Sequence, residues 1–99
     1  RHYSRRADAN QASIIEAWRA MGCSVWLTHR VGQGGPDAVT GDVSYSGRAF
    51  NTLYEIKNGL KAKLSPDEAE FHSEWRGPIF VVRDPQEAAL KQAELRKWG

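Results

Sequence analysis

The sequence has few of the features that define several large classes of protein. Cys23 is the only cysteine among 99 residues, so it forms no internal disulfide, and no cysteine cluster could hold zinc. The longest aliphatic and aromatic run, Ile79 to Val82, is far shorter than the roughly 20 residues that span a bilayer. No charged segment followed by an apolar one resembles a secretory signal. We therefore expect one cytoplasmic domain, with no membrane partner, that depends on its hydrophobic core.

The net charge is also small, with 14 Lys and Arg against 12 Asp and Glu, which gives +2. This balance permits a nucleic-acid partner without requiring one. Basic residues nevertheless cluster at two places, near the start of the chain and in its middle. Residues 1–7 are expected to form a flexible basic arm ahead of a single domain over 8–99, and the arm either binds phosphates or is a solvated terminus. The clustered residues are Arg1, Arg5 and Arg6 at the start, and Lys57, Lys61 and Lys63 in the middle.

Hydrophobic periodicity predicts alternating helices and strands in the order α-β-β-β-α-β-α. A run of strands flanked by helices indicates an α/β domain with a mixed central sheet. Helices are expected over 8–21, 65–76 and 85–98, and strands over 24–30, 38–45, 52–58 and 79–83.

Three helix starts carry capping signals, the last of them at Asp84-Pro85-Gln86-Glu87. Asp8 is the expected N-cap of the first helix, and Ser65 is that of the second, where Pro66 and Glu68 complete a capping box. Gln11 falls on the apolar stripe of the first helix, where a polar side chain needs a partner.

Asp37, Glu55 and Lys57 carry the chemistry that the sequence suggests. Glu55 and Lys57 are two residues apart on a predicted strand, so they point to one face of the sheet. If this strand pairs with the one that Asp37 precedes, the two carboxylates converge and repel unless a cation lies between them. Mg²⁺ prefers oxygen ligands, and Lys57 beside it could orient an attacking water or neutralise charge on a phosphate. These groups are the minimum needed for metal-assisted phosphodiester hydrolysis.

Two other functions fit the same residues. The chain could be a non-catalytic DNA-binding module that keeps a nuclease fold, because fold alone does not determine activity. It could also be an adaptor that binds a ligand or protein, in which Glu55 and Lys57 form a surface ion pair.

Several blocks of the sequence together resemble the PD-(D/E)XK nuclease superfamily. Pro36-Asp37 resembles the PD element and Glu55-Ile56-Lys57 the ExK element. The closest resemblance is to the small virus-type VRR-NUC branch associated with phages, and it covers nearly the whole chain. The further blocks are residues 8–11, 64–67, 71–72, 75–78 and 81–83.

The resemblance implies a restriction-endonuclease-like core and a DNA endonuclease that depends on Mg²⁺ or Mn²⁺. It implies that Asp37, Glu55 and the backbone carbonyl of Ile56 bind the metal, that Lys57 is the catalytic lysine, and that Gln11 is an active-site residue. Relatives further suggest cutting of branched DNA, such as Holliday junctions, by a homodimer, in a bacterial host cell if the chain is of phage origin. The expected DNA contacts are Arg5, Arg6, Arg30, Lys61, Lys63 and His72.

The second helix departs from the family pattern at Glu68, where relatives often have Gln. A glutamate could bind metal or act as a base, but its capping-box role also explains it. His72 lies one turn later on the same helix face, where it could contact a phosphate, donate a proton or form a hydrogen bond with Glu68. For Gln11, the alternative to an active-site role is a buried amide bonded to the backbone.

Overall fold

The backbone contains the elements that the sequence predicts, in the predicted order. The computed structural model describes residues 5–28 and 35–98. Within these ranges, the order α-β-β-β-α-β-α and the α/β class are confirmed. The elements are α1 (Arg5–Ala20), β1 (Ser24–Leu27), β2 (Ala38–Val43), β3 (Ala49–Ile56), α2 (Pro66–Glu74), β4 (Ile79–Val82) and α3 (Pro85–Trp98).

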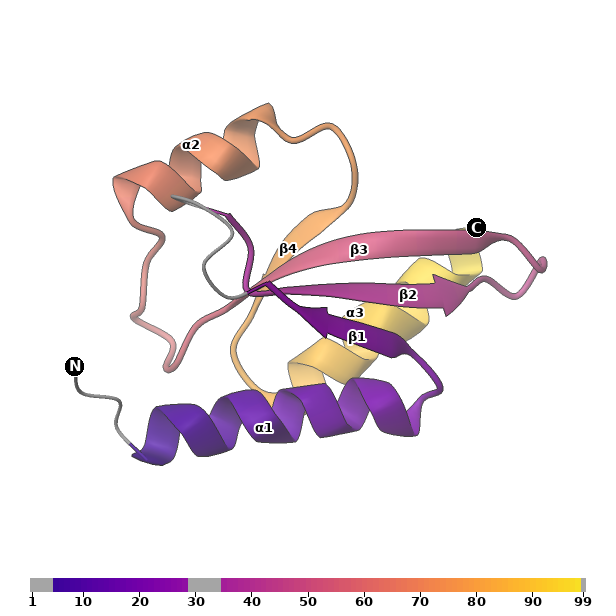
Figure 1. Ribbon diagram of the computed structural model, residues 1–99, viewed down its shortest axis with the longest axis horizontal. Helices are drawn as coiled ribbons and strands as arrows, with labels where there is room; N and C mark the ends of the chain where they lie inside the picture. Colours follow the sequence, from indigo (N-terminus) through magenta and orange to yellow (C-terminus); the bar gives the residue numbers. More distant parts are fainter. Residues whose placement is uncertain (1–4, 29–34, 99) are drawn as a thin grey trace.

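The described strands form one mixed sheet in the order β1-β2-β3-β4 (Figure 1). Neighbours are antiparallel from β1 to β3, whereas β4 runs parallel to β3. Because parallel neighbours need a crossover connection, the chain leaves the sheet after β3 and returns through α2. The predicted hairpin of the second and third strands is confirmed, with Ala38 opposite Tyr54. This pairing determines where the candidate site residues meet.

Helix α1 begins earlier than predicted, at Arg5 rather than after Asp8. The N-cap prediction for Asp8 is therefore wrong, and residues 5–7 belong to the helix rather than to an arm. Arginine and alanine are good helix formers, and no Gly or Pro separates them from the rest of the helix, so the first turn extends toward the N-terminus. Residues 1–4 of the predicted arm lie outside the described part of the chain.

Strand β3 covers Ala49–Ile56 instead of the predicted 52–58. The turn before it is tight, because Gly47 adopts a φ of 92° and the amide of Arg48 donates to Ser44 Oγ at 3.0 Å. Pairing then starts at once, with Val43 opposite Ala49. The strand also ends two residues earlier than predicted, although the amide of Lys57 still donates to the carbonyl of Val82 at 3.0 Å.

The hydrophobic core lies between the sheet and the helices α1 and α3. Trp18 is fully buried and contacts Tyr54, with 4.3 Å between the ring centroids. Its indole nitrogen donates to the carbonyl of Ala88 at 3.1 Å, which joins α1 to α3. Ile14 and Val82 complete the same buried cluster. These residues occupy one face of the sheet.

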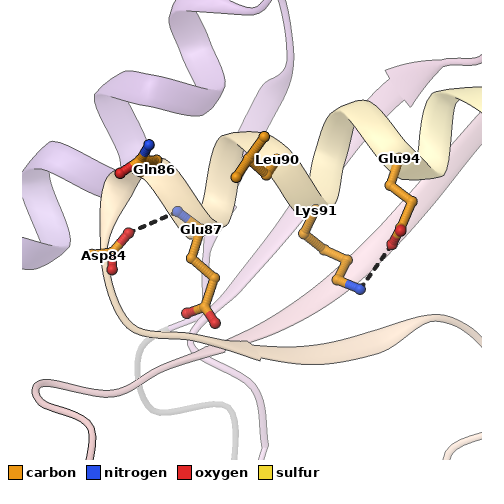
Figure 2. Close-up of a pocket in the computed structure, with 6 residues that line it drawn as sticks. All are labelled: Asp84, Gln86, Glu87, Leu90, Lys91 and Glu94. Atoms are coloured by element: carbon orange, nitrogen blue, oxygen red, sulfur yellow. Dashed lines mark hydrogen bonds and ion pairs between the residues drawn. The ribbon is translucent and has the colours of Figure 1, made fainter.

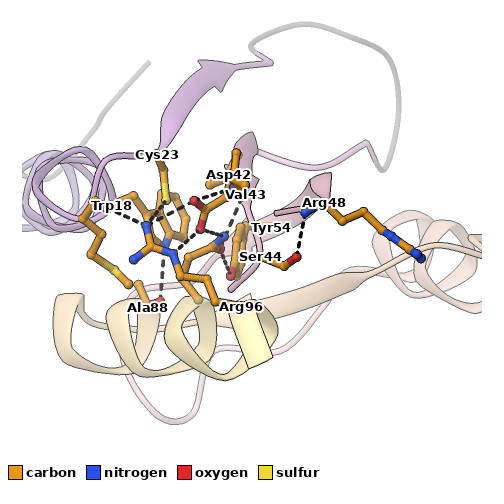
Figure 3. Close-up of polar contacts among 12 residues, drawn as sticks. Trp18, Cys23, Asp42, Val43, Ser44, Arg48, Tyr54, Ala88 and Arg96 are labelled. Carbon is orange, nitrogen blue, oxygen red and sulfur yellow. Dashed lines mark hydrogen bonds and ion pairs between the residues drawn. The ribbon is translucent and has the colours of Figure 1, made fainter. Parts of the chain in front are cut away.

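A polar network joins α3 to the sheet at the edge of this core (Figure 3). The hydroxyl of Tyr54 donates to Gln92 Oε1 at 2.7 Å, and Gln92 Nε2 donates to Asp42 Oδ2 at 2.9 Å. Arg96 Nε donates to the same Asp42 oxygen at 2.7 Å. Burial alone would raise the pKa of Asp42, but the hydrogen bonds from Arg96 and Gln92 outweigh burial and lower it. Cys23 is buried beside this network, and burial raises its pKa to about 11, so the thiol is unreactive as expected for a small core residue.

The opposite face of the sheet carries apolar side chains from all four strands. Trp26, Val39, Leu53 and Ile79 are register partners across it. Trp26 is 63% exposed, so it lies outside the hydrophobic core. Across the residues that the structure describes, none of the helices has the length and apolarity needed to cross a membrane.

Candidate functional site

Asp37 lies immediately before β2, at the end of the sheet where β3 finishes. Its backbone amide donates to the carbonyl of Tyr54 at 2.9 Å, which extends the β2–β3 ladder by one step. Its side-chain oxygen Oδ2 accepts a hydrogen bond from the amide of Ile56 at 2.7 Å. Backbone and side chain together therefore hold the Asp37 carboxyl against the last residues of β3.

Glu55 is the buried partner of Asp37 on the same face of the sheet. Its side chain points away from Tyr54 and the core, and only 1% of the residue is exposed. The pKa of Glu55 is raised to about 9, first by burial and then by a hydrogen bond to Asp37 and the charges of Asp37 and Glu68. The structure thus brings together the two carboxyl groups that the hairpin argument predicts.

Lys57 follows on the same face and is held by α2. Its Nζ donates to Glu68 Oε1 at 2.6 Å, and both side chains are largely buried, at 18% and 19% exposed. Lys57 therefore lies beside the carboxyl pair, with its charge directed to a third carboxylate.

His72 faces the same cluster from the second turn of α2. Its Nε2 lies 3.5 Å from Glu55 Oε1, and within the described residues neither buried atom makes a hydrogen bond. Burial lowers the pKa of His72. The charge of Glu68 opposes this shift and that of Lys57 adds to it, so the imidazole is neutral at pH 7. The predicted alternative of a hydrogen bond to Glu68 is wrong, because Glu68 binds other donors.

Glu68 both caps α2 and binds Lys57. The capping box of α2 is confirmed, since Glu68 Oε1 accepts from the amide of Ser65 at 2.8 Å and Ser65 Oγ accepts from the amide of Glu68 at 3.2 Å. Burial opposes ionisation of Glu68, but the hydrogen bonds from Lys57 and Ser65 together lower its pKa. The contact with Lys57 was not predicted, because it depends on the path of the connector between β3 and α2.

Gln11 remains apart from these residues. It is half-buried on α1, which packs near the core face of the sheet, and within the described residues no hydrogen bond joins it to the carboxyl cluster. The alternative prediction of a buried amide bonded to the backbone is not found either. Its neighbour Asn10 instead makes such a bond, donating to the carbonyl of Arg83 at 3.0 Å. An active-site role for Gln11 therefore stays a prediction.

The predicted DNA-contacting residues are spread over several segments. Lys61 and Lys63 are exposed in the connector between β3 and α2. Arg83 holds this connector, since its guanidinium donates to the carbonyls of Gly59 at 3.2 Å and Ala62 at 2.7 Å. Arg5 and Arg6 lie in the first turn of α1, and Arg30 lies outside the described residues.

The donors around Glu55 fit a hard divalent cation. The buried Glu55 Oε1 lacks a hydrogen-bond partner in the described part of the chain, and a cation would relieve the repulsion between Glu55 and Asp37. Mg²⁺ usually takes one or two carboxylates and completes its coordination with water and phosphate oxygens. Among the described residues, no group of three or more His, Cys, Asp and Glu side chains is arranged to hold a metal. Within the described residues, the fit therefore rests on the carboxylates of Asp37 and Glu55.

A hollow of about 390 Å³ lies elsewhere, along α3 (Figure 2). It contains none of the predicted site residues and has several acidic side chains in its wall. Such a wall repels phosphates, so we assign the hollow no part in phosphodiester chemistry. Its lining residues are Asp84, Gln86, Glu87, Leu90, Lys91 and Glu94.

No protein-family model matches the chain, and neither the curated proteins nor the solved structures contain a match to it.

Proposed function

We propose that this chain is a DNA endonuclease that depends on a divalent metal and has a restriction-endonuclease-like core of the PD-(D/E)XK type. The observation that carries the proposal is the buried Glu55 carboxyl, which has an unpaired oxygen and lies beside Asp37. Lys57 stands two residues further on the same face. A buried carboxyl group whose pKa is strongly raised, as that of Glu55 is, is typical of functional sites. The order of helices and strands supports the same core.

Asp37, Glu55 and the carbonyl of Ile56 would hold Mg²⁺ or Mn²⁺. When bound, such an ion polarises a phosphate oxygen and acidifies a water molecule. Asp37 is already oriented by the amide of Ile56, so little rearrangement is needed to present its oxygens. Lys57 would donate a hydrogen bond to the attacking water or to the phosphate oxygen on which charge develops. The exposed Lys61 and Lys63 would bind neighbouring phosphates of the DNA backbone.

We also propose that the substrate is branched DNA and that the enzyme acts as a homodimer. A two-fold dimer would place two such sites on two strands. Both statements derive from the family resemblance and are separate from the chemistry of the carboxyl pair.

A second candidate is the non-catalytic DNA-binding module. It is favoured by the ion pair of Lys57 with Glu68 and by the absence, among the described residues, of a third metal-ligating side chain at the pair. In this case Lys61 and Lys63 would still bind phosphates, but no bond would be cut. Cleavage therefore separates the two candidates.

The proposal is tested by incubating the protein with plasmid and four-way-junction DNA in Mg²⁺, Mn²⁺ or EDTA. We expect cleavage in either metal and none in EDTA. Asp37→Asn and Glu55→Gln should each lower the rate by about a hundredfold or more, since each removes a charged metal ligand. Asp67→Asn is the matched control, because Asp67 is an exposed carboxylate on α2.

Cleavage that persists in EDTA, or that survives both ligand substitutions, would exclude the proposed chemistry. Binding to the junction without cleavage in any metal would establish the second candidate.

A further inference from the structure

One carboxylate oxygen at the start of α2 accepts two hydrogen bonds from different parts of the chain. Glu68 Oε1 lies 2.6 Å from Lys57 Nζ and 2.8 Å from the amide nitrogen of Ser65. Lys57 follows the last residue of β3, whereas Ser65 is the N-cap of α2. The N-terminal cap of the helix and the position of the lysine ammonium therefore depend on the same atom.

This contact restricts a side chain that is otherwise among the most flexible. A lysine has four rotatable bonds, and ordering its ammonium requires a partner that is itself fixed. Glu68 is fixed, because it stands in the first turn of α2 and its own amide donates to Ser65 Oγ at 3.2 Å. The pair is largely buried, so solvent screens its attraction less than at an exposed site.

The contact also determines which carboxylate Lys57 neutralises. Glu55 lies on the same face and is nearly fully buried, yet its Oε1 has no hydrogen-bond partner in the described residues. If the ammonium bound Glu55 instead, it would occupy the oxygen that a cation needs. The pairing with Glu68 keeps Lys57 beside the carboxyl pair without occupying Glu55 Oε1.

We propose that Glu68 is the positioning residue for Lys57, and that it holds the ammonium beside the Asp37–Glu55 pair without placing it on Glu55 Oε1. The part of this inference that concerns cleavage rests on the proposed function. Glutamine at this position could accept the hydrogen bond from Ser65 but would carry no charge for Lys57. The substitution Glu68→Gln therefore separates the positioning role from the capping role.

The test compares wild type, Glu68→Gln and Ser65→Ala by three measurements. The first is acetylation of Lys57 at limiting reagent, followed by mass spectrometry, with the exposed Lys61 and Lys63 as internal references. The second is the kcat and KM of DNA cleavage at saturating Mg²⁺. The third is the midpoint of thermal unfolding.

For Glu68→Gln we expect acetylation of Lys57 to rise several-fold relative to Lys61 and Lys63. We expect kcat to fall about ten- to a hundredfold, because the lysine loses its orientation, while KM stays within twofold. The unfolding midpoint should stay close to that of wild type, since the cap is kept. Ser65→Ala should lower the midpoint through the lost cap, but it should change kcat and Lys57 acetylation much less than Glu68→Gln does, because Glu68 keeps its charge and its hydrogen bond from the amide of residue 65.

An unchanged acetylation ratio in Glu68→Gln would overturn the proposal, whether or not the protein cleaves DNA. An equal fall of kcat in Ser65→Ala would also overturn it, since the effect would then come from helix stability. A raised acetylation ratio in a protein that cuts no DNA in any metal would support the hold of Glu68 on Lys57 and refute the proposed function.

Discussion

The carboxyl group of Glu55 lies almost entirely out of solvent, beside two other carboxyl groups and one imidazole. Burial, Asp37 and Glu68 all favour its protonated form, and the contact with the neutral His72 adds no positive charge. A folded protein accepts such an arrangement at a cost in stability, which is common at functional sites. The metal-free protein should therefore be sensitive to pH through this one residue.

We predict that in EDTA the wild-type protein becomes less stable as the pH rises from 7 to 9, a range in which His72 is largely neutral in both the folded and the unfolded state. The pKa of Glu55 is raised from 4.5 to about 9 on folding, so the folded state binds more protons than the unfolded state between these values. The stabilising proton is fully present below the unfolded pKa and is lost through the folded one. Across this pH range, the unfolding midpoint of wild type should fall further than that of Glu55→Gln, by about 5 °C or more.

The matched control is Glu70→Gln, which removes an exposed carboxylate from α2. It should keep the wild-type pH dependence. If Glu55→Gln also kept it, Glu55 would not hold a proton in the folded state.

For single residues, the sequence predicts those positions in the site that depend only on strand geometry. Asp37, Glu55 and Lys57 could be placed on one face, because alternation along a strand and a hairpin between neighbours suffice. The contacts of Glu68 with Lys57 and of His72 with Glu55 could not be predicted. They depend on the path of a connector that has no hydrophobic period and on the position at which α2 meets the sheet.

Among the elements, the connector between β3 and α2 links the site to the proposed DNA-contacting lysines. It has no regular secondary structure, and Arg83 binds two of its carbonyls from the end of β4. The amide of Arg83 in turn donates to Glu87 Oε1 at 2.5 Å in the first turn of α3. Arg83 thus joins β4 and α3 to the segment that carries Lys61 and Lys63.

We predict that Arg83→Ala releases this connector without unfolding the domain. Limited digestion with trypsin should cleave after Lys61 and Lys63 several-fold faster than in wild type, since cleavage follows local opening. Arg48→Ala is the control, because Arg48 is exposed in the turn before β3. Equal digestion of the two variants would mean that Arg83 does not hold the connector.

Capping signals predicted the start of α2 correctly but placed the start of α1 too late. Ser65, Pro66 and Glu68 identified the start of α2 correctly, because a cap is a local arrangement of side chain and backbone. The start of α1 was placed too late, since Asp8 has cap chemistry but is preceded by residues that continue the helix. The early start of β3 depends on the tight turn at Gly47 and its hydrogen bonds, which the residue types alone do not specify.

In the whole molecule, one face of the sheet forms the core and the other carries the proposed site. One face packs on α1 and α3 through Trp18 and Tyr54, and a polar network that includes Asp42 and Arg96 closes its edge. The other face carries Asp37, Glu55 and Lys57 at one end. The proposed site therefore lies outside the core, and substitutions in it should leave the fold intact.

We predict that DNA affinity falls steeply with salt, because the binding of phosphates by lysines releases counterions. Lys61→Ala and Lys63→Ala should each lower the slope of log affinity against log salt by about one. Lys97→Ala should leave the slope unchanged, since the carbonyl of its neighbour Arg96 accepts a hydrogen bond from the amide of Tyr45 beyond the far end of β2, away from the site at the start of that strand. The end of α3 is seen in Figure 1. Slopes from fluorescence anisotropy between 50 and 200 mM KCl, roughly the range over which such contacts weaken binding, test this. Equal slopes for all three variants would place the DNA elsewhere.

The most direct test of the central claim is the single-turnover rate of DNA cleavage by Lys57→Met at saturating Mg²⁺. Methionine keeps the length of the side chain but removes the charge and the donors. The account predicts a loss of about a hundredfold or more relative to wild type, as for the removal of a donor to developing charge, and no loss in Lys97→Met. Wild-type cleavage by Lys57→Met, or an equal loss in both variants, would contradict it.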